Sequence, residues 1–143
     1  MEKIAQKMIG EGTLCVLSTC FEDDPNTSLM QYISNETCNK IYMITLESST
    51  KYHNLIRNPR VSLLIDTRDK LSSEDELIKS LILYGNGKII DDAETENDIL
   101  KRFVIKHRNL IPLTENKDCR IIEVSAEKML LLNGVDEAQY LEV

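Results

Sequence analysis

Residues 41–67 constrain the fold of this chain more than any other stretch. They begin with a short run of apolar residues that is typical of a β-strand, and a second such run covers residues 61–65. Between the two runs, hydroxyl side chains at 48–50 are typical of a helix start, and Asn58-Pro59 is typical of a helix end. The sequence therefore predicts a strand, a short helix and a second strand in close succession.

The start of this predicted helix suits an anion. The first amides of a helix lack intrahelical acceptors and lie at the positive end of the helix dipole. A phosphate at this position would meet these donors and the side chain of Lys51. Serine and threonine also begin many ordinary helices by capping a free amide, so a plain capped helix on a solvated face explains the same residues. Both interpretations stay open on this segment alone.

The pattern Thr45-x-x-x-Ser49-x-Lys51 and the residues after it carry a resemblance to a known family. With Asn54-Leu55, Asn58-Pro59-Arg60 and Val61-Ser62-Leu63-Leu64, the pattern resembles the FMN-binding split-barrel family related to pyridoxamine 5'-phosphate oxidase. In that family the lysine and the hydroxyls around it hold the FMN phosphate, and the preceding strand runs beside the isoalloxazine ring. The resemblance implies the following cofactor-binding residues: Gln31, Met43, Ile44, Thr45, Ser48, Ser49, Thr50 and Lys51.

The resemblance also implies a homodimer with its cofactors at the subunit interface and an FMN-dependent oxidoreductase with an unknown small substrate. Two residues depart from the family pattern: Thr50 stands where oxidases of the family commonly carry arginine, and Glu47 adds a carboxylate near the predicted phosphate. The arginine and histidine signature that handles the substrate in true pyridoxamine phosphate oxidases has no convincing counterpart. No catalytic residue is assigned. A non-catalytic flavin- or haem-binding module and a deazaflavin-binding barrel stay open as alternatives.

Composition sets the class of protein. A chain of 143 residues with 42% hydrophobic and 29% charged residues is typical of one globular domain, here residues 1–143. The net charge of −7 argues against broad binding to nucleic acid or anionic lipid, because both require a basic surface. The first residues do not resemble an export signal, and no run has the length of a membrane span. The sequence therefore predicts a cytoplasmic protein.

The acidic composition means that a phosphorylated ligand needs a local group of basic residues. The residues expected to be available are Lys51, Arg57, Arg60 and, with less support, Arg68 or Lys88. His53 is expected on the helix surface or near the phosphate, and His107 fits the preference for cations at helix ends. The irregular spacing of the four cysteines favours free thiols over a metal site.

The rest of the chain predicts a mainly antiparallel β-structure with a few helices. The resemblance implies that this structure is a split β-barrel. Gly85-Asn86-Gly87 predicts a bulge or a close backbone approach, and Asp91 and Glu94 have the spacing of a capping box at the start of a helix of about four turns. The expected order is βββα ββα ββ. Apart from the segment 41–67, the expected elements are a helix at 2–9 with a stop at Gly10 and Gly12, strands at 13–19, 27–34, 77–90, 118–124 and 128–132, a turn at 22–26, and loops at 68–76 and around Pro112.

Overall fold

The computed structural model describes all residues, 1–143. A single sheet of eight strands has the order β2-β1-β5-β6-β7-β4-β3, and β8 pairs with β7 beside this path. All neighbouring strands are antiparallel. The strands are β1 Leu14–Phe21, β2 Asp24–Gln31, β3 Ile33–Ser34, β4 Lys40–Leu46, β5 Arg60–Asp66, β6 Lys79–Ile89, β7 Cys119–Asn133 and β8 Glu137–Leu141. The helices are α1 Lys3–Glu11, α2 Thr50–Arg57, α3 Ala93–Lys106, η1 Arg108–Leu110 (3-10) and α4 Ile111–Thr114.

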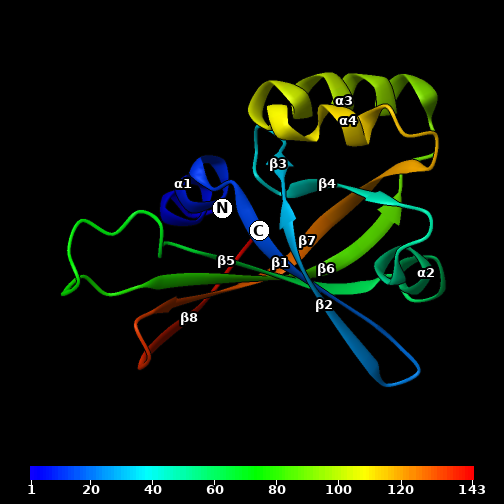
Figure 1. Cartoon of the computed structure of the whole chain (residues 1–143). Coiled ribbons are helices and arrows are strands. Elements are labelled where there is room, and N and C mark those ends of the chain that lie inside the picture. Colours follow the sequence, from blue (N-terminus) through cyan, green and yellow to red (C-terminus); the bar gives the residue numbers. More distant parts are fainter.

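The sheet curls back on itself because β2 and β3 are nearly continuous. Only Tyr32 separates these two strands, yet β2 pairs with β1 at one end of the path and β3 pairs with β4 at the other. The ends of the path are therefore joined by the chain itself, and the sheet forms the curled barrel of Figure 1. This confirms the predicted class, mainly antiparallel β-structure in a split barrel. No helix is long and apolar enough to cross a membrane.

Two groups of apolar side chains hold the fold together. The larger group fills the barrel, where alternate residues such as Leu17, Leu63 and Leu83 point inward and are almost fully buried. Residues of α1 join this group. The smaller group lies on the outside of the barrel, where Phe103 of α3 packs with Tyr42 and other side chains of β3, β4 and β7. The helices α3 and α4 therefore form a layer over one side of the barrel, at the top of Figure 1.

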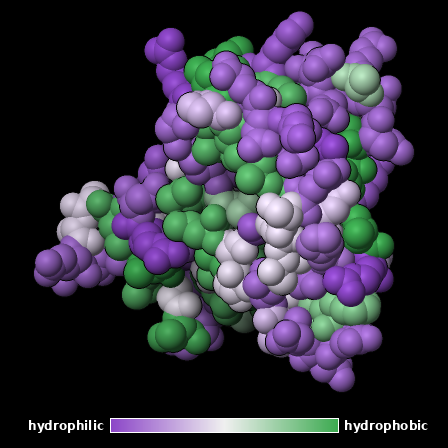
Figure 2. All heavy atoms as spheres, turned by 45° about the vertical axis from the view of Figure 1, so that its right-hand side comes forward, coloured by the Kyte–Doolittle hydropathy of each residue, from purple (hydrophilic) through white to green (hydrophobic).

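The opposite wall of the barrel carries an apolar row that no helix covers. The strand registers place one outward-facing residue of each strand next to the following one across β2, β1, β5, β6, β7 and β8. Figure 2 shows exposed green atoms across the middle of the molecule, below the mostly purple surface at the top. We call the outward-facing residues that the registers bring together the outer apolar row. They are Leu29, Val16, Leu64, Ile82, Leu130 and Tyr140.

The first hairpin differs from the expected one. The turn is limited to Glu22 and Asp23, whose φ values are 51° and 63°, so β2 already begins at Asp24. Two residues with positive φ form the tight turn that matches the twist of a hairpin. Pro25 lies inside β2, and this strand tolerates a proline because it pairs with β1 alone. The predicted strand at 27–34 is thus divided into β2 and β3.

The C-terminal strands also differ from the prediction. The expected strands at 118–124 and 128–132 form the single strand β7, in which Glu127 is the extra residue of a bulge opposite Tyr84 and Gly85. A Cβ atom on Gly85 would lie 2.0 Å from the carbonyl oxygen of Ser125, so the predicted close backbone approach is confirmed. The bulge disturbs the alternation of side chains and so imitates a strand break. Strand β8 was not predicted.

The helix boundaries are corrected at three positions. Helix α1 continues through Gly10 to Glu11 and is followed by Gly12. The N-cap of α3 is Asp92, which accepts a hydrogen bond from the Thr95 amide at 3.0 Å, so the capping box predicted at Asp91 is wrong. Pro112 lies in the first turn of α4 and not in a loop. The predicted exposed loop at 68–76 is confirmed, and it projects from the barrel between β5 and β6 in Figure 1.

Candidate functional site

The end of β4, the turn after it and the first residues of α2 form a polar corner. We call residues 45–51 the α2 corner. Ser49 is the N-cap of α2, and its hydroxyl accepts a hydrogen bond from the Tyr52 amide at 3.3 Å. The Thr45 and Ser49 hydroxyl oxygens lie 2.7 Å apart, and Thr45 is only 4% exposed. The end of the strand and the start of the helix are therefore fixed to each other by side chains of the corner itself.

Two backbone donors at the start of α2 have no acceptor. The Ser49 amide donates to the Leu46 carbonyl at 3.0 Å, and the Tyr52 amide is taken by the Ser49 side chain. The amides between them, those of Thr50 and Lys51, donate to no group of the chain. Both amides lie at the positive end of the α2 dipole. The corner thus offers two oriented donors to an anion.

Lys51 is the cation of this corner. Its side chain is partly buried, and burial lowers the pKa of its ammonium group. No carboxylate of the chain forms an ion pair with Lys51. A partly desolvated cation without an acid partner is unfavourable in the empty protein and becomes favourable when an anion binds beside it. Thr50 and Ser48 are exposed next to it.

Helix α2 is held rigidly against the barrel. The Asn54 side chain donates to the buried Thr19 hydroxyl at 3.1 Å, and the Asn58 side chain donates to the Cys20 carbonyl at 2.8 Å. Leu55 enters the core beside Gly87, where a Cβ atom would lie 2.6 Å from the leucine side chain. These contacts explain why the sequence pattern continues into the helix beyond the lysine: the asparagines and the leucine position the corner.

The edge of β4 beside this corner is open. Strand β3 pairs only with Ile41 and Tyr42 of β4, so from Met43 onward β4 has a ladder partner on the β7 side alone. The side chains of Met43 and Ile44 are buried, in the barrel and under α3 respectively. Of these two residues, only Ile44 turns its backbone amide and carbonyl toward the open edge. Those of Met43 face β7 and pair with Ile122, so the expectation that the Met43 backbone is available beside the cofactor is corrected. This gap in the ladder is the split of the barrel, and it leads directly to the α2 corner.

The other basic residues expected near the corner are not gathered there. Each of them has a contact of its own elsewhere. The guanidinium of Arg57 lies 4.2 Å from the centre of the Phe21 ring, and the ion-pair partners are Glu127 for Arg60, Asp66 for Arg68 and Glu123 for Lys88. Of the basic residues predicted to gather around the phosphate, only Lys51 lies at the corner.

Sequence reasoning missed a charge pair beside the corner. The guanidinium of Arg120, on β7, lies 2.6 Å from a carboxylate oxygen of Glu47. Arg120 pairs with Thr45 across the β4–β7 ladder, so its position depends on the register of two strands far apart in the sequence. No local signal in the sequence indicates this pair.

Gln31 lies in a different polar group, which we call the His107 network. Its side-chain amide exchanges two hydrogen bonds with the Asn109 amide, at 3.0 and 2.9 Å, and its nitrogen also donates to Nδ1 of His107 at 3.0 Å. Nε2 of His107 lies 2.7 Å from the Tyr32 carbonyl, which can only accept. His107 is therefore a buried ring at the end of α3 with a hydrogen-bond partner at each nitrogen.

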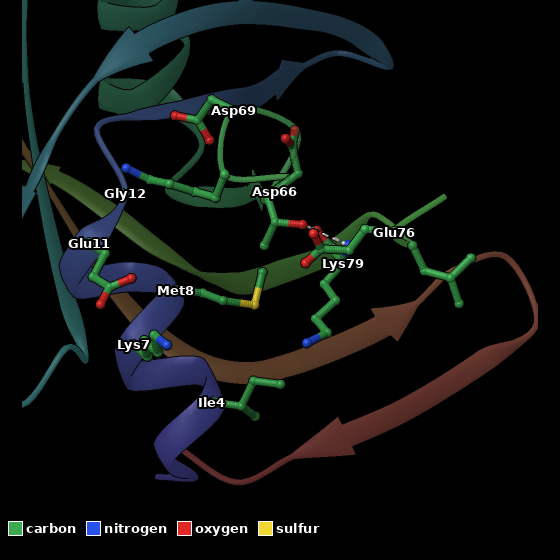
Figure 3. A pocket seen from close by; sticks show the side chains of 12 residues that line it. Ile4, Lys7, Met8, Glu11, Gly12, Asp66, Asp69, Glu76 and Lys79 are labelled. Carbon is green, nitrogen blue, oxygen red and sulfur yellow. Dashed lines mark hydrogen bonds between the residues drawn. The ribbon is translucent and has the colours of Figure 1, made fainter. Parts of the chain in front are cut away.

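Two hollows of the surface lie away from these groups. One, of about 310 Å³, lies between α1, the end of β5 and the following loop, and Figure 3 shows that acidic and basic side chains such as Glu11, Asp66 and Lys79 are mixed around it. The other, of about 260 Å³, lies over the part of the outer apolar row that includes Leu29 and Leu64. Neither hollow contains a residue predicted to bind the cofactor.

Comparison with known proteins gives the family. Residues 1–133 match the family described as pyridoxamine 5'-phosphate oxidase. A pyridoxamine 5'-phosphate oxidase homolog of Schizosaccharomyces pombe is 42% identical over 59 residues, a match that spans 34% of this chain and 30% of that protein. The chain thus matches less than a third of this curated relative.

Two solved structures show the same fold at low sequence identity. A FAD-binding protein of Mesorhizobium loti has a TM-score of 0.73 at 13% identity, with 92% of this chain and 94% of that chain covered. A heme binding protein of Mycobacterium smegmatis has a TM-score of 0.82 at 14% identity, with 96% of this chain and 56% of that chain covered.

Proposed function

Because the chain belongs to the pyridoxamine 5'-phosphate oxidase family, we propose that it binds FMN, with the phosphate at the α2 corner. The observation that carries this proposal is Lys51, a partly buried cation without an acid partner beside two amides without acceptors. Ser48, Ser49 and Thr50 add hydroxyl groups, and Thr45 fixes the Ser49 side chain. These are the groups that a phosphate monoester requires.

The open edge of β4 supports the placement of the flavin ring. The backbone amide and carbonyl of Ile44 are free on that side, and Ile44 lies one short turn before the residues proposed to bind the phosphate. The chain contains no tryptophan, so the ring would be bordered mainly by backbone and aliphatic side chains. Gln31 has both amide hydrogens engaged, so only its carbonyl oxygen remains able to accept a hydrogen bond from the ring.

We propose an oxidoreductase for this protein, with a small unidentified substrate. Bound FMN would supply the electron-transfer chemistry, whereas the protein would bind and orient it and control the access of water. The four free cysteines agree with the reducing cytoplasm that we propose as its location. The solved heme binding relative favours a second candidate, a flavin- or haem-binding module without catalysis.

A homodimer is part of the proposal. The outer apolar row crosses six strands without a covering helix, and its end residues Leu29 and Tyr140 are 67% and 63% exposed. A contiguous apolar face of this kind is typical of a surface that another subunit covers. A planar cofactor is too large for the interior of so small a barrel, so in the proposed dimer the partner would cover its outer face.

Titration of the apoprotein with FMN, riboflavin and haem tests the proposal. FMN is expected to bind at least about tenfold more tightly than riboflavin, because only FMN carries the phosphate for the α2 corner. Equal affinity for the two flavins would contradict the phosphate site, and a Soret band without flavin binding would favour the haem module. Reduction of bound FMN by NADH or NADPH, with reoxidation by a quinone, would support the oxidoreductase over the module.

Leu29→Glu tests the dimer. A carboxylate in the outer apolar row is expected to convert the dimer to monomers, with weaker binding of both flavins, as measured by sedimentation and titration. Leu77→Glu, at an exposed leucine of the loop between β5 and β6, is the matched control. If the wild-type protein is a monomer and still binds FMN more tightly than riboflavin, the dimer is no longer part of the proposal.

A further inference from the structure

The ion pair between Glu47 and Arg120 lies at the α2 corner but belongs to none of the groups described as phosphate ligands. The Glu47 amide donates to the Asp118 carbonyl at 3.0 Å, so the turn before α2 is fixed to the start of β7. The guanidinium of Arg120, two residues after Asp118, lies 2.6 Å from the Glu47 carboxylate. The side chains are 30% and 39% exposed, so the pair is only partly screened by water.

The charges of the corner explain why such a pair matters. Within residues 45–51, Glu47 and Lys51 are the charged side chains, and their charges cancel. A phosphate dianion at the corner would be attracted by the lysine and repelled by the glutamate. With Arg120 included, the local charge becomes +1. Thr50 supplies no charge of its own at the start of α2.

The hydrogen bonds of Arg120 show how it acts. Its Nη1 donates to the Cys119 and Lys117 carbonyls at 2.7 and 3.0 Å, and its Nη2 binds Glu47. Both terminal nitrogens are thus engaged within the chain. We infer that Arg120 determines the specificity for a phosphorylated cofactor by neutralising Glu47, without contacting the phosphate. This inference rests on the proposed FMN site and assigns to Arg120 a positioning and screening role.

Two single variants and their combination test this role. Arg120→Met leaves the Glu47 charge uncompensated and is expected to weaken FMN about five- to tenfold while riboflavin changes less than about twofold. Glu47→Gln leaves the arginine charge in excess and is expected to tighten FMN about two- to fivefold. The double variant Glu47→Gln/Arg120→Met removes both charges and is expected to return the FMN affinity to within about twofold of wild type. Arg120→Lys, which keeps the charge, is expected to remain close to wild type.

A matched ion pair provides the control. Arg60 and Glu127 form a pair at 2.9 Å beyond the far end of α2, with both side chains about half exposed. Arg60→Met and Glu127→Gln are expected to leave the ratio of FMN to riboflavin affinity unchanged. Urea unfolding of each variant, followed by titration with both flavins, separates a loss of folding from a loss of phosphate discrimination.

Three results would overturn the inference alone. A double variant that binds FMN as weakly as Arg120→Met would mean that the arginine contacts the phosphate directly. Equal losses of FMN and riboflavin in Arg120→Met would mean that the arginine only supports the turn. If Arg120→Met does not fold, Glu47→Gln serves as the test. Weaker FMN binding by Glu47→Gln than by the wild-type protein would then overturn the inference. Wild-type protein without a preference for FMN over riboflavin would overturn the proposed function together with the inference, whereas the first three results leave the proposed function standing.

Discussion

The α2 corner and the His107 network are both polar groups on the barrel, but their donors are used differently. In the His107 network, the amides of Gln31 and Asn109 bind each other and both ring nitrogens of His107 have partners. In the α2 corner, the two amides at the start of the helix have no acceptor and Lys51 has no acid partner. The network joins β2 to the end of α3, whereas the α2 corner has exposed side chains at Ser48 and Thr50.

This difference separates a structural group from a binding group. A buried polar group with every partner present stabilises the fold, and the loss of one member leaves the others unpaired. A group with oriented but unused donors contributes little to folding and is stabilised only when a ligand arrives. Variants of the network should therefore change stability, and variants of the corner should change ligand affinity.

His107→Ala should give the largest effect. The buried ring leaves a cavity, and the Tyr32 carbonyl and a Gln31 hydrogen lose their partner. The free energy of unfolding is expected to fall by about 2–4 kcal/mol, as measured by urea denaturation. The preference of the remaining folded protein for FMN over riboflavin should be retained. His53→Ala, at an exposed histidine of α2, should stay within about 0.5 kcal/mol of wild type, and an equal loss in both variants would remove the contrast.

Lys51→Ala should show the opposite pattern. The dissociation constant for FMN is expected to rise about 10- to 100-fold, because a charge-assisted contact to the phosphate is lost, whereas that for riboflavin should change little. The unfolding free energy should stay constant or rise, because burial of the charged ammonium group is unfavourable without a ligand. Titration and urea denaturation measure the two quantities. Lys101→Ala, on the exposed side of α3, is the control, and a similar loss of riboflavin binding in Lys51→Ala would refute the phosphate contact.

Ser49→Ala should affect both quantities, because this residue belongs to the helix cap and to the proposed phosphate site. Loss of the bond to the Tyr52 amide is expected to cost about 1 kcal/mol of unfolding free energy. The free energy of FMN binding should weaken by about the same amount or more, and that of riboflavin binding should weaken less. Thermal unfolding with and without FMN measures both effects. Ser48→Ala, which removes an exposed hydroxyl without a capping bond, should leave the stability nearly unchanged.

The dependence on pH should give the smallest effect. Because burial lowers the Lys51 pKa in the folded protein, the unfolded chain binds more protons between that lowered pKa and the ordinary value of 10.5. The unfolding free energy of the apoprotein, relative to Lys51→Met, should therefore rise as the pH increases through this window. The preference for FMN over riboflavin should decline in the same window, because the ammonium charge is lost. A preference that persists unchanged up to pH 10.5 would contradict the lowered pKa.

Much of the α2 corner was predictable because its chemistry is local. Ser49, as the N-cap, and Lys51, in the first turn, follow from the geometry of a helix start, which depends on a few consecutive residues. Gly85 was also recognised, because only glycine permits so close an approach of a neighbouring strand. The contacts of Gln31 with His107 could not be predicted, since these residues are 76 positions apart.

The errors in the sheet have the same origin. The bulge at Glu127 interrupts the alternation of β7, so a periodicity argument divides one strand into two. Strand β8 has four exposed residues out of five and so gives no alternating pattern. It forms because the second half of β7 offers an edge for pairing, which the amino-acid composition of β8 does not reveal.

The sequence by itself determined the strand, the capped helix and the cation at its start, because these depend on bonds between near neighbours in the chain. Only the tertiary structure decided that Arg120 meets Glu47, that β2 and β3 close the barrel, and that β4 keeps an open edge beside the corner. These features depend on strand registers, and a register is fixed when distant side chains pack into one core.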